Sequence, residues 1–185
     1  EESIVRYKGS HSELSVDVDS VIGKDGYLYD KGEYQFRDSQ YRMACSVEKN
    51  FINDGISIIE AGTGLGKTYA YLVPAIIMSI KNNIPIVIST YTKTLQEQLF
   101  HKDIKNIIST IDHDLKSIMI KGRGNYICLN RLKMLEENSR DLVSDLEIYE
   151  LAALICWSFY THSGDIDECS SFSLERGVKL WNLIK

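Results

Sequence analysis

The sequence predicts an α/β fold in which short parallel strands alternate with helices. Three apolar runs of strand length, residues 56–60, 85–90 and 117–121, are separated by two longer segments, 66–81 and 93–108, with helical spacing of apolar residues. A glycine-rich loop joins the first run to the first helical segment. Such strand–helix–strand–helix–strand alternation implies parallel pairing with right-handed crossovers.

The segments before the first strand are less regular. Residues 1–33 are expected to form a polar lead-in, because turn signals interrupt them and only residues 14–21 alternate as a short strand would. Residues 39–53 have the pattern of a helix that ends at an Asp-Gly pair. In the helix predicted over 66–81, Pro74 is expected to introduce a kink or to shorten the helix.

The pattern changes near Gly122, where we place a domain boundary. Residues 34–121 form the α/β part, and residues 122–185 form a helical part. The helices predicted in the second part cover residues 128–137, 142–160 and 173–184.

Composition narrows the class of protein. The 185 residues are 44% hydrophobic, enough for a core, and the net charge of −5 confines any nucleic-acid contact to a local patch. No apolar run reaches the roughly 18 residues of a membrane span, and no signal peptide is visible, which favours the cytosol. The chain lacks an initiator Met and ends in a helical stretch, so we expect it to be a piece of a longer protein.

The loop after the first strand has the pattern of a phosphate-binding loop. It consists of Ala61, Gly62, Thr63, Gly64, Leu65 and Gly66, followed by Lys67 and Thr68. Glycines let backbone N–H groups wrap a phosphate, and the following helix directs its positive end at the same group. Lys67 would contact the β- and γ-phosphates of ATP, and the Thr68 hydroxyl would ligate Mg²⁺. Ala61 departs from the strict pattern, which opens with Gly, but is a tolerated variant. The alternative, a glycine-rich turn without a ligand, is disfavoured because Lys-Thr at this spacing has no packing purpose.

Two further polar stretches flank this loop. Thr90, Thr92, Lys93 and Gln96 follow the second strand, on the ligand side of such a sheet, and suit contacts to a phosphodiester backbone. An N-capped surface helix, with Thr92 or Thr94 as the cap, explains the same residues. Upstream, Gln40 follows Tyr34 and Arg37 and could hydrogen-bond adenine, although a polar helix start is the simpler interpretation.

A third stretch, Lys-Gly-Arg-Gly-Asn-Tyr-Ile-Cys at residues 121–128, follows the third strand. Together the stretches resemble the DinG/XPD-type family of superfamily 2 DNA helicases, strongly over residues 34–128 and weakly as far as Trp181. The resemblance implies part of a RecA-like P-loop motor lobe followed by the start of a helical iron–sulfur insertion. It also implies a 5′→3′ helicase in DNA repair or replication, driven by single-strand-dependent ATP hydrolysis, in the bacterial cytoplasm near the nucleoid.

The resemblance also assigns roles to residues. It implies that Arg37 and Gln40 contact the base, and that Thr90, Thr92, Lys93 and Gln96 contact single-stranded or forked DNA. Cys128 would be the first of four ligands of a [4Fe–4S] cluster. The other three ligands are expected outside the chain, because Cys45, Cys156 and Cys169 lack the tight grouping of cluster ligands. Cys156 is expected to be a small core residue.

The pair Asp167-Glu168 is rejected as a Mg²⁺-binding acidic pair because the residues before it are too polar for a core strand. The chain alone is therefore expected to hydrolyse little ATP and to hold no cluster. A P-loop kinase or phosphotransferase, and a nucleotide-dependent DNA-binding module without catalysis, remain as alternatives. A monomer is favoured.

Overall fold

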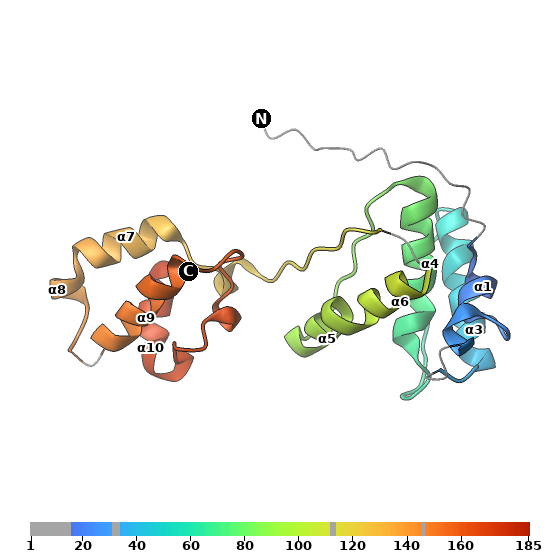
Figure 1. Ribbon diagram of the computed structural model, residues 1–185, viewed down its shortest axis with the longest axis horizontal. Coiled ribbons are helices and arrows are strands. Elements are labelled where there is room, and N and C mark those ends of the chain that lie inside the picture. The colour runs from blue at the N-terminus through green and yellow to red at the C-terminus, as the bar shows by residue number, and fades with distance from the viewer. Residues whose placement is uncertain (1–15, 31–33, 112–113, 146) are drawn as a thin grey trace. The chain divides into compact units, whose positions relative to one another are not determined.

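The protein is described from a computed structural model that covers residues 16–30, 34–111, 114–145 and 147–185 (Figure 1). The chain divides into two compact units, residues 1–119 and 120–185. In the described ranges both units are built of helices and connecting segments.

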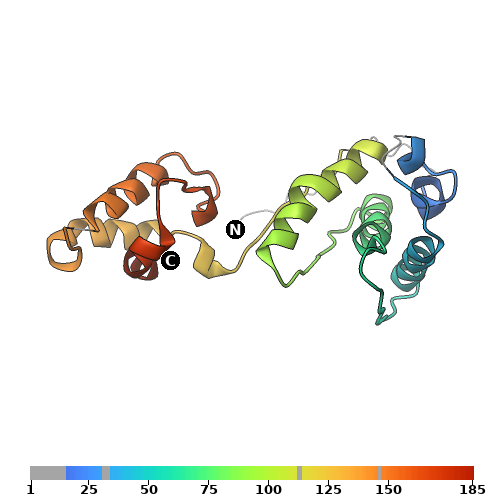
Figure 2. The same cartoon turned by 90° about the horizontal axis from the view of Figure 1, so that it is seen from below.

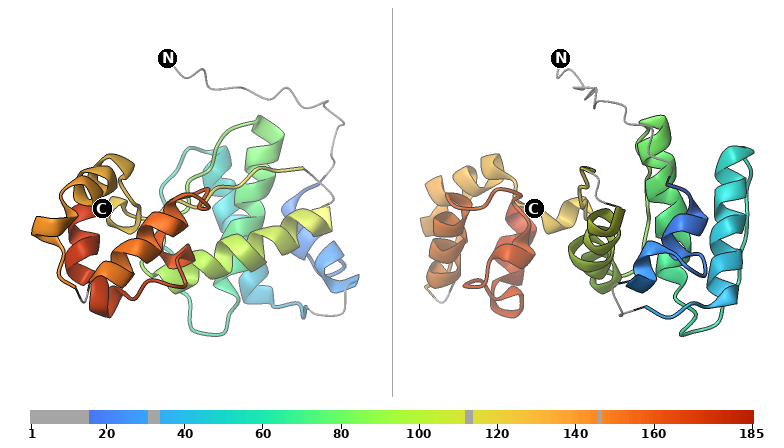
Figure 3. Two further views of the ribbon diagram at one scale, coloured as in Figure 1. Left: turned by 60° about the vertical axis from the view of Figure 1, so that its left-hand side comes forward. Right: turned by 45° about the vertical axis from the view of Figure 1, so that its right-hand side comes forward.

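The core of the first unit is built around one long helix. Its elements are α1 (Val18–Ile22), α2 (Tyr27–Asp30), α3 (Asp38–Ile52), α4 (Lys67–Asn82), α5 (Lys93–Gln98), the π-helical turn η1 (Leu99–Asp103) and α6 (Ile104–Ile111). α4 packs along α3 and also contacts α1, η1 and α6, and Figure 3 shows α3 and α4 side by side. Seven residues of α4 are buried, so this helix supplies much of the apolar surface of the unit.

α4 continues through Pro74 to Asn82, so the expected shortening at this proline is wrong. A proline inside a helix costs about 3 kcal/mol, because it removes one hydrogen bond and crowds the preceding turn. Leu72, Val73, Ile76 and Ile77 are all buried around it, and each contributes roughly 1.5–3 kcal/mol by burial. Packing of this apolar stripe therefore outweighs the local cost.

The predicted parallel sheet is wrong. In the described residues no strand is formed, and the one β-bridge found there joins Tyr126 and Asp165 in isolation. The three apolar runs predicted as strands have no regular structure, and Ile56 and Ile58 are 96% and 99% exposed. A strand needs a hydrogen-bonded neighbour, and the apolar composition of a run carries no information about one. In the second run, residues 85–90, the Ile88 side chain packs against the helical core, whereas the side chain of the preceding residue, Val87, is exposed.

The lead-in also differs from its prediction. Residues 1–15 and 31–33 lie outside the described ranges, so the structure describes less than half of the predicted lead-in. The rest of the strand expected over 14–21 is wrong, because α1 begins at Val18. Asp17 caps this helix: its carboxylate accepts from the Ser20 N–H at 2.8 Å, and the Ser20 hydroxyl accepts from the Asp17 N–H at 3.0 Å.

The second unit is a small helical body. Its elements are the 3₁₀ turn η2 (Arg123–Asn125), α7 (Leu129–Glu137), α8 (Ser139–Leu142), α9 (Ile148–Ser158), the 3₁₀ turn η3 (Ile166–Glu168) and α10 (Leu174–Ile184). α10 packs against α7 and α9 and buries Leu180 and Ile184, and Figure 2 gives a second view of these helices. The helix predicted over 142–160 begins later than expected, at Ile148.

Candidate nucleotide-binding loop

The glycine-rich loop leads directly into α4, whose first residue is Lys67. Gly66, at the N-cap, has φ +79°, and Gly64 has φ +78°. Residues with a side chain rarely adopt this left-handed backbone conformation, so these two glycines allow the chain to turn sharply into the helix. The free N–H groups and positive end of α4 therefore face the turn, as binding of an anion requires.

Three carbonyl groups of this loop accept hydrogen bonds from side chains. The Lys67 ammonium donates to the Ala61 carbonyl at 2.8 Å, and the Gln40 amide donates to the Gly66 carbonyl at 2.6 Å. The Arg37 guanidinium donates to the Gly64 carbonyl. These donors offset the negative ends of the loop peptides, which would otherwise repel a phosphate, and they fix the shape of the loop before any ligand arrives.

Gln40 is held from both ends of its amide. It is 2% exposed, and its carbonyl oxygen accepts from the Tyr34 hydroxyl while its NH₂ group donates to Gly66. The predicted contact between Gln40 and a base stays a prediction, and it requires the buried amide to exchange at least part of this arrangement. Arg37 is exposed and lies at the start of α3, where a base contact also stays a prediction.

The tip of the loop is open. Gly62, Thr63 and Gly64 are exposed, and a Cβ atom built on Gly62 or Gly64 meets no atom within 4 Å. Leu65 and Thr68 are half-buried. Open space above braced backbone is the form that a phosphate-binding turn needs.

Tyr71 is a neighbour of this loop that sequence reasoning missed. Tyr71 is half-buried on α4, three residues after Thr68. Burial raises the pKa of Tyr71 above its ordinary value; the neighbouring Thr68 hydroxyl opposes this shift, and the Asp103 charge adds to it by a smaller amount. The spacing of three residues between Thr68 and Tyr71 was the available signal, because it places both on one face of a helix.

The candidate DNA-binding segment begins α5. Thr92 is its N-cap: the Thr92 hydroxyl accepts from the Leu95 N–H at 3.3 Å, and the Thr90 hydroxyl donates to the Thr92 carbonyl at 3.3 Å. The capped-helix interpretation therefore describes Thr92 correctly. Thr92 and Lys93 are exposed and Gln96 is half-buried, and their contact with DNA stays a prediction.

The motif at residues 121–128 closes a turn in the second unit. The buried Lys121 ammonium lies 2.6 Å from the Asp165 carboxylate and 2.9 Å from the Asp167 carboxylate. The Tyr126 hydroxyl accepts from the Lys121 N–H at 2.7 Å, and the Trp181 indole donates to the Gly124 carbonyl at 3.0 Å. Asp167, rejected as a Mg²⁺ ligand on sequence grounds, lies in a 3₁₀ turn and pairs with Lys121.

The four cysteines do not form a cluster site. Cys128 is the half-buried N-cap of α7, and its N–H donates to the Ile184 carbonyl at 2.7 Å. Cys169 is buried, whereas Cys156 is exposed, so the prediction of a core position for Cys156 is wrong. In the described ranges no group of three or more clustered metal-ligand side chains includes a cysteine. The thiols present therefore do not fit an iron–sulfur cluster by themselves.

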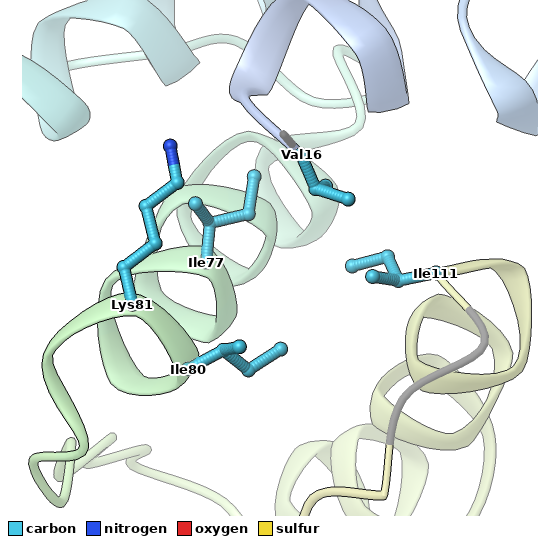
Figure 4. A pocket seen from close by; sticks show the side chains of 5 residues that line it. All are labelled: Val16, Ile77, Ile80, Lys81 and Ile111. Carbon is cyan, nitrogen blue, oxygen red and sulfur yellow. The ribbon is translucent and has the colours of Figure 1, made fainter. Parts of the chain in front are cut away.

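A separate depression beside the C-terminal half of α4 is unsuited to a nucleotide. It is lined by Val16, Ile77, Ile80, Lys81 and Ile111 (Figure 4). Its volume of about 10 Å³ is far below the roughly 300–1,000 Å³ typical of small-molecule sites. None of the helices in the described ranges combines the length and apolar character of a membrane span.

Curated relatives match most of this chain. A protein of Haemophilus influenzae named ATP-dependent DNA helicase YoaA is 39% identical over 134 residues, which cover 72% of this chain and 20% of that protein. Escherichia coli YoaA is 34% identical over 148 residues, covering 80% of the chain and 22% of the relative. A Bacillus subtilis protein named 3′-5′ exonuclease DinG is 33% identical over 150 residues, covering 80% of the chain and 15% of the relative.

The chain thus spans about a fifth of the length of these relatives. No family model matches the chain, and no solved structure matches it.

Proposed function

The chain is related to the DinG and YoaA helicases across most of its length, and from that relationship we propose that it forms the nucleotide-binding part of an ATP-dependent DNA helicase. The observation that carries the proposal is the braced loop at the start of α4. Its turn geometry and its engaged carbonyl groups support a phosphate site that is shaped before the ligand binds.

The loop would hold the phosphates of ATP. The backbone N–H groups of residues 62–66 and the positive end of α4 bind the phosphate oxygens. Lys67, which donates to the Ala61 carbonyl here, would hold the β- and γ-phosphates, and the Thr68 hydroxyl would hold the Mg²⁺ that accompanies them. We propose that Arg37 and Gln40, which brace the loop, also contact the base.

The start of α5 would contact DNA. Thr90, Thr92, Lys93 and Gln96 offer hydroxyl, ammonium and amide groups to the phosphodiester backbone of single-stranded or forked DNA. Such contacts tolerate any base sequence, as movement along a strand demands. We infer 5′→3′ movement, single-strand-dependent ATP hydrolysis and a role in DNA repair or replication from the resemblance alone.

Cys128 is proposed as one ligand of a [4Fe–4S] cluster in the whole protein, with residues 122–185 at the start of the cluster-bearing part and residues 34–121 as the nucleotide-binding part. The proposed location is the bacterial cytoplasm near the nucleoid, and the proposed state is a monomer.

Chemical analysis of iron in the whole protein, with Cys128→Ser and Cys156→Ser compared, tests the assignment of Cys128 as a cluster ligand: only the first change should lower the iron content.

Lys67→Ala tests the nucleotide site. Loss of a charge-assisted contact worth about 1.5–3 kcal/mol should weaken binding of a non-hydrolysable ATP analogue by about 10- to 150-fold. The measurement is a titration of the 185-residue chain with a fluorescent form of the analogue in the presence of Mg²⁺.

Lys81→Ala is the matched control, because Lys81 is an exposed lysine in the last turn of the same helix. Its analogue affinity should equal that of the unaltered chain. Equal affinities for Lys67→Ala and Lys81→Ala would remove the loop from the nucleotide site.

A further inference from the structure

One side of α9 is both apolar and exposed. The other side of this helix packs Leu151 and Leu154 into the core of the second unit. The exposed side continues into the turn that follows the helix, and we call it the α9 outer face. It consists of Tyr149, Ala152, Cys156, Phe159 and Tyr160. Apolar residues on both sides are typical of a helix that is covered on both sides.

Helical geometry keeps these five side chains together. Residues 149, 152, 156 and 160 follow intervals of three, four and four, which return to one side of a helix. Phe159 has helical backbone angles (φ −81°, ψ −17°), and the Tyr160 N–H donates to the Trp157 carbonyl at 2.9 Å, so the turn extends the face. Tyr149, Phe159 and Tyr160 are 83%, 81% and 81% exposed, which leaves three large aromatic residues in contact with water over most of their surface.

The charge around the α9 outer face indicates what kind of surface could cover it. No Lys or Arg occurs between residues 141 and 175, and Arg176 and Lys179 of α10 pair with Glu150 and Glu147. Proteins that stack single-stranded nucleic acid on aromatic residues also present cations to its backbone, and helices that lie on membranes are rich in Lys and Arg. An uncharged aromatic face without cations fits an apolar protein surface instead.

The size of the face indicates that the covering surface belongs to the same polypeptide. A buried Phe or Tyr removes about 150–250 Å² from water, so three such residues at this exposure offer roughly 350–600 Å². Stable complexes of separate proteins bury about 800 Å² on each partner. The face is too small to hold a second molecule alone. A surface on the same polypeptide is kept near it by the covalent connection, so it needs less area.

We propose that the α9 outer face packs against an apolar surface in another part of the whole protein. The chain spans about a fifth of the length of the relatives that it matches, so a protein of their size contains further parts that can supply this surface. The contact would bury the three aromatic residues and join the second unit to the rest of the molecule. The inference does not depend on the proposed nucleotide site.

Cys156 is a natural probe of this contact, because its thiol lies on the face and is exposed. The rate of its reaction with a maleimide is measured in the 185-residue chain and in the whole protein, and peptide mass spectrometry separates it from the other cysteines. We expect at least about tenfold slower labelling in the whole protein, because a covered thiol reacts only when the contact opens. Cys169, which is 5% exposed, should stay protected in both samples and so reports that the second unit is folded.

Phe159→Asp in the whole protein tests whether the aromatic residues make the contact. A carboxylate is not buried in an apolar contact without a partner, so labelling of Cys156 should rise to near the rate in the 185-residue chain. Met134→Asp is the matched control. Met134 is a 63% exposed apolar residue on α7 rather than on the face, and replacing it should leave Cys156 protected.

Four other outcomes contradict the proposal. Equal labelling of Cys156 in the 185-residue chain and in the whole protein would show that the rest of the protein leaves the face open. Protection that disappears on dilution would assign the face to a second copy of the protein. Protection that appears only with single-stranded oligothymidine would assign it to nucleic acid. Protection that survives Phe159→Asp would exclude the aromatic residues from the contact.

Discussion

Gly66 meets two structural demands at once. Its φ of +79° is accessible to glycine at little cost, and a Cβ atom at this position would meet the side-chain amide of Gln40. Gly64 meets only the first demand, since its φ is +78° but a Cβ atom there enters open space. Gly62 has neither a left-handed backbone nor a close neighbour. Comparing substitutions at the three glycines therefore distinguishes the cost of a left-handed backbone from the cost of a steric clash.

A series of alanine substitutions should show this order. Gly64→Ala should lower the free energy of unfolding by about 1–2 kcal/mol, the cost of left-handed backbone for a residue with a side chain. Gly66→Ala should lower it further, because the Gln40 amide must also move away from the Gly66 carbonyl. Gly62→Ala should change it by less than about 0.5 kcal/mol. Urea unfolding followed by circular dichroism measures all three, and equal losses at Gly62 and Gly66 would contradict the argument.

Local spacing predicts part of the loop and misses the rest. The positions of Lys67 and Thr68 at the start of α4 follow from a short pattern that needs no distant information. The hydrogen bonds from Arg37 and Gln40 join them to loop residues that lie 27 and 26 positions away in the sequence. The spacing of apolar residues along the chain contains no information on such distant pairs. The roles of these four residues toward ATP stay predictions.

At the scale of elements, helices were predictable and strands were not. Periodicity places helices over 39–53 and 66–81, and the structure has them at Asp38–Ile52 and Lys67–Asn82. A helix satisfies its backbone within itself, so a local pattern contains most of the information. The run at residues 56–60 has strand-like composition, but a strand depends on a neighbour that the pattern does not encode.

α1 shows how much a short helix depends on its cap. Asp17→Ala removes the hydrogen bond to Ser20 and should cost about 1 kcal/mol. The backbone hydrogen bond from Ser20 is the main reason that the pKa of Asp17 lies below its ordinary value of 3.8. The stabilisation is therefore complete well above that ordinary value, and it is lost as the pH falls through the lowered pKa.

Asp17→Asn is the control for this cap. Asparagine also accepts the Ser20 bond, so it should retain most of the stability at neutral pH while removing the dependence on acid. Urea unfolding at pH 7 and at pH 3 provides the comparison. A cap effect of Asp17→Ala that is the same at both values would exclude the carboxylate as its source.

On the scale of the whole molecule, the two units contain different probes of folding. The sequence has two tryptophans, Trp157 and Trp181, and both lie in the second unit. Tryptophan fluorescence therefore reports on residues 120–185, whereas binding of an ATP analogue would report on the loop in the first unit. One sample can thus show whether a substitution disturbs one unit or both.

Lys121→Ala tests whether loss of a buried ion pair destabilises the second unit alone. The Lys121 side chain is 2% exposed and that of Asp165 8%, so the change leaves a buried carboxylate without its cation. Breaking a buried pair in this way costs about 3–5 kcal/mol. The urea midpoint from tryptophan fluorescence should fall sharply, with analogue binding unaffected.

Lys179→Ala is the comparison, because its pair with Glu147 spans 3.4 Å and the lysine side chain is 61% exposed. Exposed pairs contribute about 0–1 kcal/mol, so this variant should unfold almost as the unaltered chain does. Equal losses for Lys121→Ala and Lys179→Ala would show that burial does not set the value of these pairs.

The π-helical turn η1 constrains how the chain can change in evolution. η1 fits one extra residue between α5 and α6, which otherwise form one continuous helix. Because the wide turn absorbs that residue, Ile107 and Ile111 keep the buried faces that they would have on an uninterrupted helix. Deleting one residue within η1 would restore regular α-helical geometry, whereas deleting one within α6 would rotate the residues that follow it by roughly 100°, because a helix turns once every 3.6 residues. Descendants of this sequence can therefore change the length of this segment more readily at η1 than within the helices on either side of it.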